Sequence, residues 1–191
     1  MKSMIKSVVL ASALFVVPVA VQAQAIPAAI VVVVDTQQIF AECTACKSAQ
    51  TQLQSQAAAI QERAKALGEP LQAEAEAIQK AVGGKAPDAA LQTRIRALQT
   101  KEGSANQEIQ GRQQTFARNR AYVAEQINAK LNPIISQVMQ KRGANIAVDQ
   151  GATLAAASSL DVTADVLAQL NTQLPSVGVN APAAPAKPTG R

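Results

Sequence analysis

The sequence predicts an α+β protein in which a long antiparallel helical hairpin, a coiled-coil arm, is inserted between the strands of a small β-rich body. Three observations predict it: a heptad-spaced apolar ladder that reverses at a Gly-Gly turn, a run of β-branched residues before the ladder, and a short alternating segment after it. A 3.5-residue repeat gathers apolar side chains on one narrow seam that needs a partner helix. The two halves of the ladder are therefore expected to pair with each other.

The first 23 residues have the layout of a secretory signal peptide. Two lysines lie near the start, residues 8–21 are apolar, and small residues allow cleavage after Ala23 or after Ala25. The competing interpretation is a retained membrane anchor, because apolar character resumes at 30–34. However, neither apolar stretch, 8–21 or 30–34, reaches the length of about 20 residues that spans a bilayer. We expect the mature chain to be soluble and, in a bacterium with two membranes, periplasmic.

The body is expected to comprise residues 26–44 and 140–174. Residues 28–35 form a compact run of β-branched and small apolar residues, which is typical of a buried strand. The predicted core of the body, which would also hold subunits together, contains five strand residues: Ile30, Val32, Val34, Ile146 and Val148.

The second part of the body is predicted to begin with a β-hairpin. Residues 145–149 alternate as a strand does, and a tight turn at 150–151 leads into a further short strand at 153–157. A final helix from 164 to 174 can be capped by Thr163. Three short strands and one helix bury little surface alone, so self-association is expected.

The arm is expected to span residues 45–139, with its turn at 83–88, where glycines can end one helix and a proline prevents simple continuation. At 1.5 Å per residue, each helix would be about 50 Å long. The ladder rises and returns through these positions: Leu53, Ala57, Ile60, Ala64, Leu67, Leu71, Ile78, then Leu91, Ile95, Leu98, Ala105, Ile109, Phe116 and Val123. It is interrupted by three charged residues: Glu74, Glu102 and Arg112.

A hinge is predicted at one height of the arm. A turn centred between residues 85 and 86 places residues whose numbers add to about 171 opposite one another, so Gly68 faces Gly103, with Pro70 half a turn away. Glycine costs a helix about 1 kcal/mol and proline about 3 relative to alanine. The cluster indicates either an arm that flexes there or a kink that is merely tolerated.

Basic charge is concentrated at the tip of the arm. The whole chain has 18 basic and 13 acidic residues. Five basic residues lie around the turn, against the single acidic Asp88: Lys80, Lys85, Arg94, Arg96 and Lys101. They form either a solvated helix face or a site that steers acidic unfolded chains or anionic surfaces towards the arm.

Composition argues against several functions. The chain has no histidine and no tryptophan, one tyrosine and three phenylalanines. It therefore lacks the commonest general base and metal ligand and has few aromatic rings for stacking on bases. We expect no enzyme activity, no catalytic residue, no metal or other cofactor, and no nucleic-acid partner.

Cys43 and Cys46 form the one reactive-looking motif, a C-x-x-C at the predicted start of the arm. In an oxidising compartment they could form a structural disulfide or remain paired thiols. The alternatives are inert buried residues, or a metal or redox function, for which zinc would need two further ligands.

Several segments resemble the Skp (OmpH-like) family of periplasmic chaperones. They are Val-Val-Val-Asp at 32–35 with Thr-Gln-Gln-Ile-Phe after it, Gln-Gln-Thr-Phe-Ala-Arg at 113–118, Asn-Ile-Ala-Val-Asp at 145–149, and, most specifically, Asp-Val-Thr-Ala-Asp-Val-Leu at 161–167. The resemblance covers about residues 30–171.

This resemblance implies a homotrimer whose three helical arms enclose a cavity. It implies a holdase that binds unfolded outer-membrane proteins without ATP and keeps them soluble. The alternatives are a structural coiled-coil protein or scaffold of the envelope, and a thiol oxidoreductase.

The sequence departs from the family's pattern in two respects. Residues 175–191 extend past the family's compact end, and their Ala, Pro, Gly and Asn content predicts a disordered tail. Some relatives are credited with a lipopolysaccharide site built from arm lysines and arginines, and we do not place that pattern residue by residue on this sequence. An anionic membrane surface or lipopolysaccharide is thus a candidate partner on the charge of the tip alone.

Overall fold

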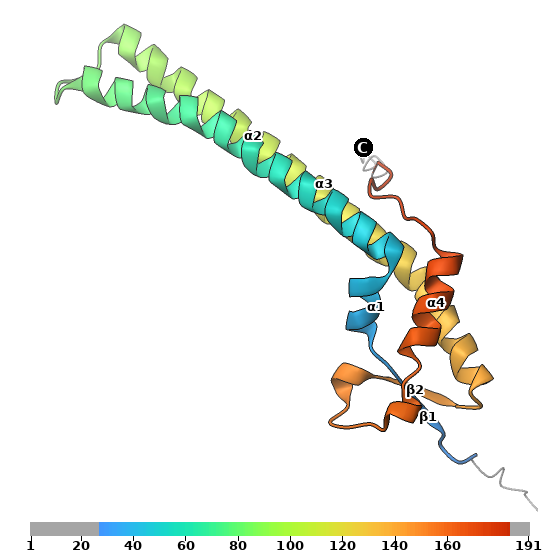
Figure 1. The fold of residues 1–191 in the computed structure, drawn as a ribbon. Helices are drawn as coiled ribbons and strands as arrows, with labels where there is room; N and C mark the ends of the chain where they lie inside the picture. Colours follow the sequence, from blue (N-terminus) through green and yellow to red (C-terminus); the bar gives the residue numbers. More distant parts are fainter. Residues whose placement is uncertain (1–26, 184–191) are drawn as a thin grey trace, which may run out of the picture.

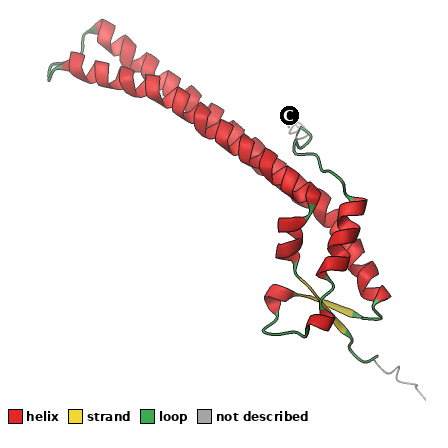
Figure 2. Cartoon of the chain, viewed as in Figure 1, coloured by secondary structure: helices red, strands yellow, loops and turns green. Residues whose placement is uncertain are grey.

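The computed structural model describes residues 27–183: a long helical hairpin rises from a small body, and the segment after the last helix runs back beside the hairpin (Figures 1 and 2). The α+β prediction is confirmed. The predicted signal peptide lies outside the described residues. The elements in chain order are β1 (Val31–Val34), α1 (Thr36–Glu42), α2 (Thr44–Val82), α3 (Ala89–Lys141), β2 (Ile146–Asp149), two short 3-10 turns (Gln150–Ala152 and Ser158–Leu160) and α4 (Thr163–Gln173).

Local caps explain where the helices of the hairpin begin and end. α2 ends where Gly83 adopts a left-handed φ of 53°, a conformation that glycine takes without strain. α3 begins where the Asp88 carboxylate accepts a hydrogen bond from the Leu91 backbone N–H at 2.8 Å. Residues 83–88 thus connect the helices, at the position where the sequence indicates a turn.

Two ion pairs between the helices report their register. Arg63 Nε lies 2.8 Å from Glu108 Oε1, and Arg94 Nη2 lies 3.0 Å from Glu74 Oε1. In each pair the residue numbers add to within three of the predicted 171. The antiparallel alignment of the ladder is therefore the one that the turn position predicts.

The body contains a two-stranded sheet in which β1 and β2 are parallel, with Val31 opposite Ile146 and Val34 opposite Asp149. The whole hairpin forms the crossover between them, and parallel strands need such a long connection. On its other side β1 forms a bridge to Asp161, and the Val162 N–H donates to the Val33 carbonyl at 3.0 Å. β1 therefore takes both of its neighbours from the C-terminal part of the chain.

The predicted β-hairpin is wrong, because no strand follows β2 at 153–157. The Asp149 carboxylate accepts a hydrogen bond from the Gly151 N–H at 2.8 Å, which curls the chain into a 3-10 turn directly after β2. The segment that follows is Thr-Leu-Ala-Ala-Ala, with one β-branched residue and little apolar surface to pack on a sheet. The predicted capping role of Thr163 is also wrong: Val162 is the N-cap of α4, and the Thr163 hydroxyl accepts from the Asp35 N–H instead.

The hydrophobic core joins the body to the base of the hairpin. Val32 and Val34 are buried as predicted and Val148 is half-buried, whereas Ile30 and Ile146 are 52% and 41% exposed in the single chain. Both exposed isoleucines lie at the N-terminal ends of the strand pair. The rest of the core comes mainly from α2, α3 and α4: Ala45, Cys46, Ala49, Val123, Ile127, Leu131, Ile134, Val138, Val166 and Leu170. The body therefore extends into both ends of the segment that the sequence assigns to the arm.

Residues 175–183 are not the disordered tail that composition predicts. After α4 the chain runs back along the hairpin, where Val179 is buried and Val177 packs against the core. The Gln126 side chain bonds both the N–H and the carbonyl of Gly178, at 2.9 and 2.8 Å. Composition does not predict that this segment is ordered, because only two valines and backbone hydrogen bonds hold it in place. Residues 184–191 lie outside the described part.

Candidate functional site

The middle of the arm has a seam that its two helices cover incompletely. We call residues 50–77 of α2 together with residues 99–118 of α3 the shaft. The shaft contains no fully buried side chain, although the apolar ladder runs along it. Two helices alone cover each ladder residue from one side only, so part of every apolar side chain still faces water.

Grooves flank this seam in the shaft. One, of about 370 Å³, is lined by Pro70 among others, and another, of about 490 Å³, is lined by Gly68. Both grooves share Leu67, Leu71 and Ala105, which therefore form the ridge between them. The shaft thus presents shallow apolar surface on both sides of a ridge.

The three predicted hinge residues lie at this same level. Gly68 and Pro70 are inside α2 and line the two grooves, while Gly103 is exposed on α3 between residues that line them. A side chain added at either glycine would meet no atom within 4 Å. Neither glycine is required by close packing, so its cost to the helix is not offset by a contact that only glycine permits.

Two of the three charged interruptions of the ladder, Glu74 and Arg112, form ion pairs. Glu108 binds Arg63 across the seam through two hydrogen bonds, at 2.8 and 3.0 Å, and binds Arg112 one turn along α3 at 2.9 Å. The hydrogen bonds from Arg63, and then those from Arg112, lower the pKa of Glu108 from 4.5 to about 2. Sequence reasoning missed Glu108, although the predicted register places it opposite Arg63.

The tip of the arm is basic, with one of its charges partnered. Arg94 forms the ion pair with Glu74, which precedes the basic residues of the tip in α2. All five predicted tip residues are exposed. Within residues 27–183, the other four form no ion pair: Lys80, Lys85, Arg96 and Lys101.

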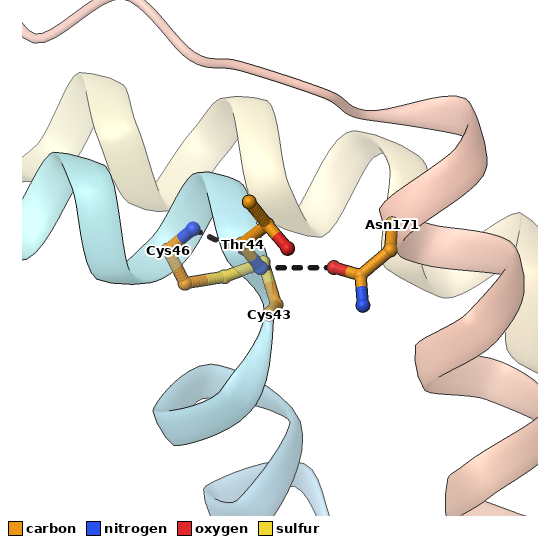
Figure 3. The surroundings of a disulfide bond; sticks show 4 residues. All are labelled: Cys43, Thr44, Cys46 and Asn171. Carbon is orange, nitrogen blue, oxygen red and sulfur yellow. Dashed lines mark hydrogen bonds between the residues drawn. A yellow bond between two sulfur atoms is a disulfide. The ribbon is translucent and has the colours of Figure 1, made fainter.

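Cys43 and Cys46 form a disulfide at the junction of α1 and α2 (Figure 3). The two sulfur-bearing residues are 0% and 5% exposed. The neighbouring Thr44 N–H donates to Asn171 Oδ1 of α4 at 2.9 Å, as the dashed line in Figure 3 shows. The bond thus fixes the corner where the body meets the arm, and its burial does not suit exchange with a second thiol.

Acidic side chains that the sequence did not single out join the ends of the strands. Asp149 accepts hydrogen bonds from the hydroxyl and the N–H of Thr36, 113 residues earlier. The Thr36 hydroxyl, followed by the Gly151 N–H, lowers the pKa of Asp149. The hydroxyl and N–H of Thr163 lower the pKa of Asp161 in the same way. These carboxylates thus accept hydrogen bonds from backbone and hydroxyl groups within the body.

Within residues 27–183, no group of three or more Cys, Asp or Glu side chains is placed to hold a metal ion. None of the helices in this part of the chain combines the length and apolar character that crossing a membrane requires.

Residues 30–170 match the family model described as outer membrane protein (OmpH-like). The chain belongs to this family. A solved structure from Caulobacter crescentus CB15, assigned as an outer membrane chaperone (OmpH-like), superposes with a TM-score of 0.69 at 18% sequence identity. The match covers 85% of this chain and 96% of that one, and at this identity it bears on the fold. The comparison with curated proteins gave no match. The OmpH-like resemblance of the sequence is confirmed, and the residues after 170 lie beyond the family match.

Proposed function

We propose that this OmpH-like protein is an ATP-independent holdase chaperone of the periplasm, which binds unfolded outer-membrane proteins and keeps them soluble between its arms. Family membership supports a chaperone type of function. The observation that carries the proposal is the shaft, where the apolar ladder, broken at Glu74, Glu102 and Arg112, stays partly exposed. A chain that only needed a rigid spacer would gain stability by covering this surface.

Such a surface suits clients that have no fixed shape. Each about 100 Å² of apolar surface that a client covers contributes about 2.5 kcal/mol, which is weak alone. One client chain can make several such contacts along an arm, and because the contacts are linked, their binding free energies combine. Each single contact still dissociates and re-forms readily. The shallow grooves beside the Leu67 and Leu71 ridge demand no particular side chain. Retention without nucleotide follows from this arrangement.

We propose that three copies associate through the body. Ile30 and Ile146 lie side by side, because the Ile30 carbonyl accepts from the Ile146 N–H at 3.1 Å, and both side chains are largely exposed. Leu160, 36% exposed, adds to the apolar surface of the body. A second and third copy could cover this surface and leave the arms free. Replacing residues 64–101 by the turn 83–88 should then leave a trimer in analytical ultracentrifugation, whereas a monomer would reject this assembly.

The basic tip is proposed to draw acidic unfolded segments, or an anionic membrane surface, towards the arm. Lys80, Lys85, Arg96 and Lys101 supply unpartnered exposed charge within the described residues, and Arg94 contributes less because Glu74 neutralises it. Steering of this kind acts on the rate of capture and not on the apolar contacts that retain the client.

The test is whether the purified mature protein keeps a urea-diluted outer-membrane porin from aggregating without nucleotide. We expect suppression at a small molar excess, and strong loss of suppression in Leu67→Ser with Leu71→Ser. The matched control is Ala73→Ser with Ala77→Ser, two exposed positions of the same helix, which should act as wild type. If wild type leaves aggregation unchanged, the scaffold alternative takes the place of this proposal.

A further inference from the structure

The segment after α4 is bound to the base of the arm through its backbone. Gln126 of α3 bonds the Gly178 N–H and carbonyl, and Asn119 Oδ1 accepts from the Ala181 N–H at 2.9 Å. Asn119 is only 4% exposed, and its amide nitrogen donates to Gln56 Oε1 of α2 at 2.9 Å. Side-chain amides of α3 therefore make the backbone contacts that a neighbouring β-strand would make. Gln56 of α2 adds one contact to a tail side chain, because its amide donates to Asn180 Oδ1 at 3.2 Å.

The spacing of these amides fits an extended chain. Asn119 and Gln126 are seven residues apart on α3, or about 10.5 Å at 1.5 Å per residue. Gly178 and Ala181 are three residues apart, or about 10 Å at 3.3 Å per extended residue. One heptad of helix thus matches three residues of extended chain, with a bend of the backbone at Asn180 between the two contacts.

The bound segment also alternates as a strand does. Val177, Val179 and Ala181 turn towards the protein, while Ser176, Gly178 and Asn180 are exposed. Alternating apolar and polar residues are the signature of strands in outer-membrane β-barrels. The tail therefore has the pattern of the clients that the proposed function names.

Further surface that an extended chain could contact lies on the arm, on the tip side of Asn119. Asn180 lines the edge of a groove of about 580 Å³ between α2 and α3, with Ile60, Phe116 and Arg112 among the other lining residues. Arg112 lies one further heptad along from Asn119, so a longer extended segment would meet another polar side chain at the same spacing. Among residues 175–183, Asn180 alone lines this groove.

We propose that the base of the arm is a binding site for extended polypeptide, that the chain's own residues 177–181 occupy it as a client mimic, and that an unfolded outer-membrane protein displaces them. This rests on the proposed holdase function. The tail is joined to α4 by only a few residues, so its effective concentration at the site is about millimolar. Isolated short peptides would then be excluded, and a long client with further contacts on the shaft would displace the tail.

The test uses the full mature chain with Val177→Asp and Val179→Asp, which should release the tail because a carboxylate is costly to bury there. The probe is a fluorescein-labelled peptide with the sequence of residues 174–183, followed by fluorescence anisotropy. We expect the released variant to bind it at least tenfold more tightly than wild type. Adding Gln126→Ala to the released variant should weaken binding. Gly178→Ala in the wild-type chain is the matched control, since its methyl would meet Tyr122 at an ordinary 3.5 Å and the tail should stay bound.

The outcomes separate this site from the holdase proposal. If the released variant keeps the helix content of wild type and yet binds the peptide no better, the site does not exist. If it binds the peptide but excess denatured porin fails to displace the probe, client displacement is rejected. The peptide assay needs no chaperone activity, so an inactive wild type in the aggregation test would remove only the proposed function. A peptide carrying both aspartates should not bind, and equal binding of that peptide would also contradict the proposal.

Discussion

The base and the shaft of the hairpin carry the same apolar repeat but differ in how far they bury it. At the base, Ile127, Leu131 and Ile134 are 3%, 2% and 0% exposed, because the body covers the seam with a third layer. In the shaft, ladder residues such as Ile60 and Ile109 are only half-buried, since the two helices have no further cover. Periodicity therefore identifies the face that meets the partner helix, while the number of layers decides whether that face can still bind something else.

The largest expected effect is a difference between the base and the shaft in how much a truncated isoleucine lowers the free energy of unfolding. Ile134→Ala at the base should cost about 2–5 kcal/mol in free energy of unfolding, because it leaves a cavity in a closed core. Ile109→Ala in the shaft should cost about 1 kcal/mol, since only part of its side chain leaves water on folding. Urea unfolding followed by circular dichroism measures both. Ile134→Val offers a milder change if the alanine variant does not fold, and equal costs at the two sites would contradict the comparison.

The next effect concerns the proposed hinge in the shaft. Pro70→Ala should stabilise the arm by up to about 3 kcal/mol, and Gly68→Ala and Gly103→Ala by about 1 kcal/mol each. The combined variant should melt at a higher temperature and retain only small clients. Gly111→Ala is the control, because its added methyl also meets nothing within 4 Å and it lies outside the hinge. If amide exchange in wild type is as slow at 66–72 and 101–105 as in the adjacent turns, there is no hinge.

A smaller effect is expected on the rate at which the tip captures clients. Capture should slow as salt is added, because exposed charges are screened beyond about 8 Å at physiological ionic strength. Stopped-flow measurement of Arg96→Gln should show a loss of rate at low salt. Arg94→Gln combined with Glu74→Gln is its matched counterpart and should show less, because this ion pair carries no net charge. Rates that are independent of salt would reject steering by the tip.

The smallest effect should be a pH dependence of the shaft through Glu108. Its pKa is lowered to about 2 in the folded arm, so its contribution to stability is complete above its ordinary pKa of 4.5 and is lost as the pH falls towards 2. Glu108→Gln should therefore reduce the drop in melting temperature between about pH 5 and about pH 2.5. Glu102→Gln, on the same helix and outside the ion pair, should leave that drop unchanged. An equal drop in wild type and Glu108→Gln would contradict the assignment.

The features that could be predicted from sequence are those that depend on neighbouring residues. The turn at 83–88, the strand at 31–34 and the register of the ladder follow from local glycine, β-branched and heptad patterns. The partner of Arg94 could also have been found, since the register brings Glu74 close to it.

The features that could not be predicted depend on contacts distant in sequence. β2 pairs with β1 and not with a following strand, because Thr36 and Val33 bind groups 113 and 129 residues later. The tail is ordered because Gln126 binds Gly178, 52 residues away. Neither interaction leaves a local periodic signal, and composition alone gave the opposite answer for residues 175–183.

The central claim is that clients bind the partly exposed shaft and that the structure of the body does not change. Hydrogen exchange measured by mass spectrometry, with and without a bound denatured porin, tests it most directly. We predict that client binding slows exchange in residues 50–77 and 99–118, speeds it in 177–181 as the tail is displaced, and leaves β1 and α4 unchanged. Protection confined to the body, or no change in the shaft when the porin is bound, would contradict it.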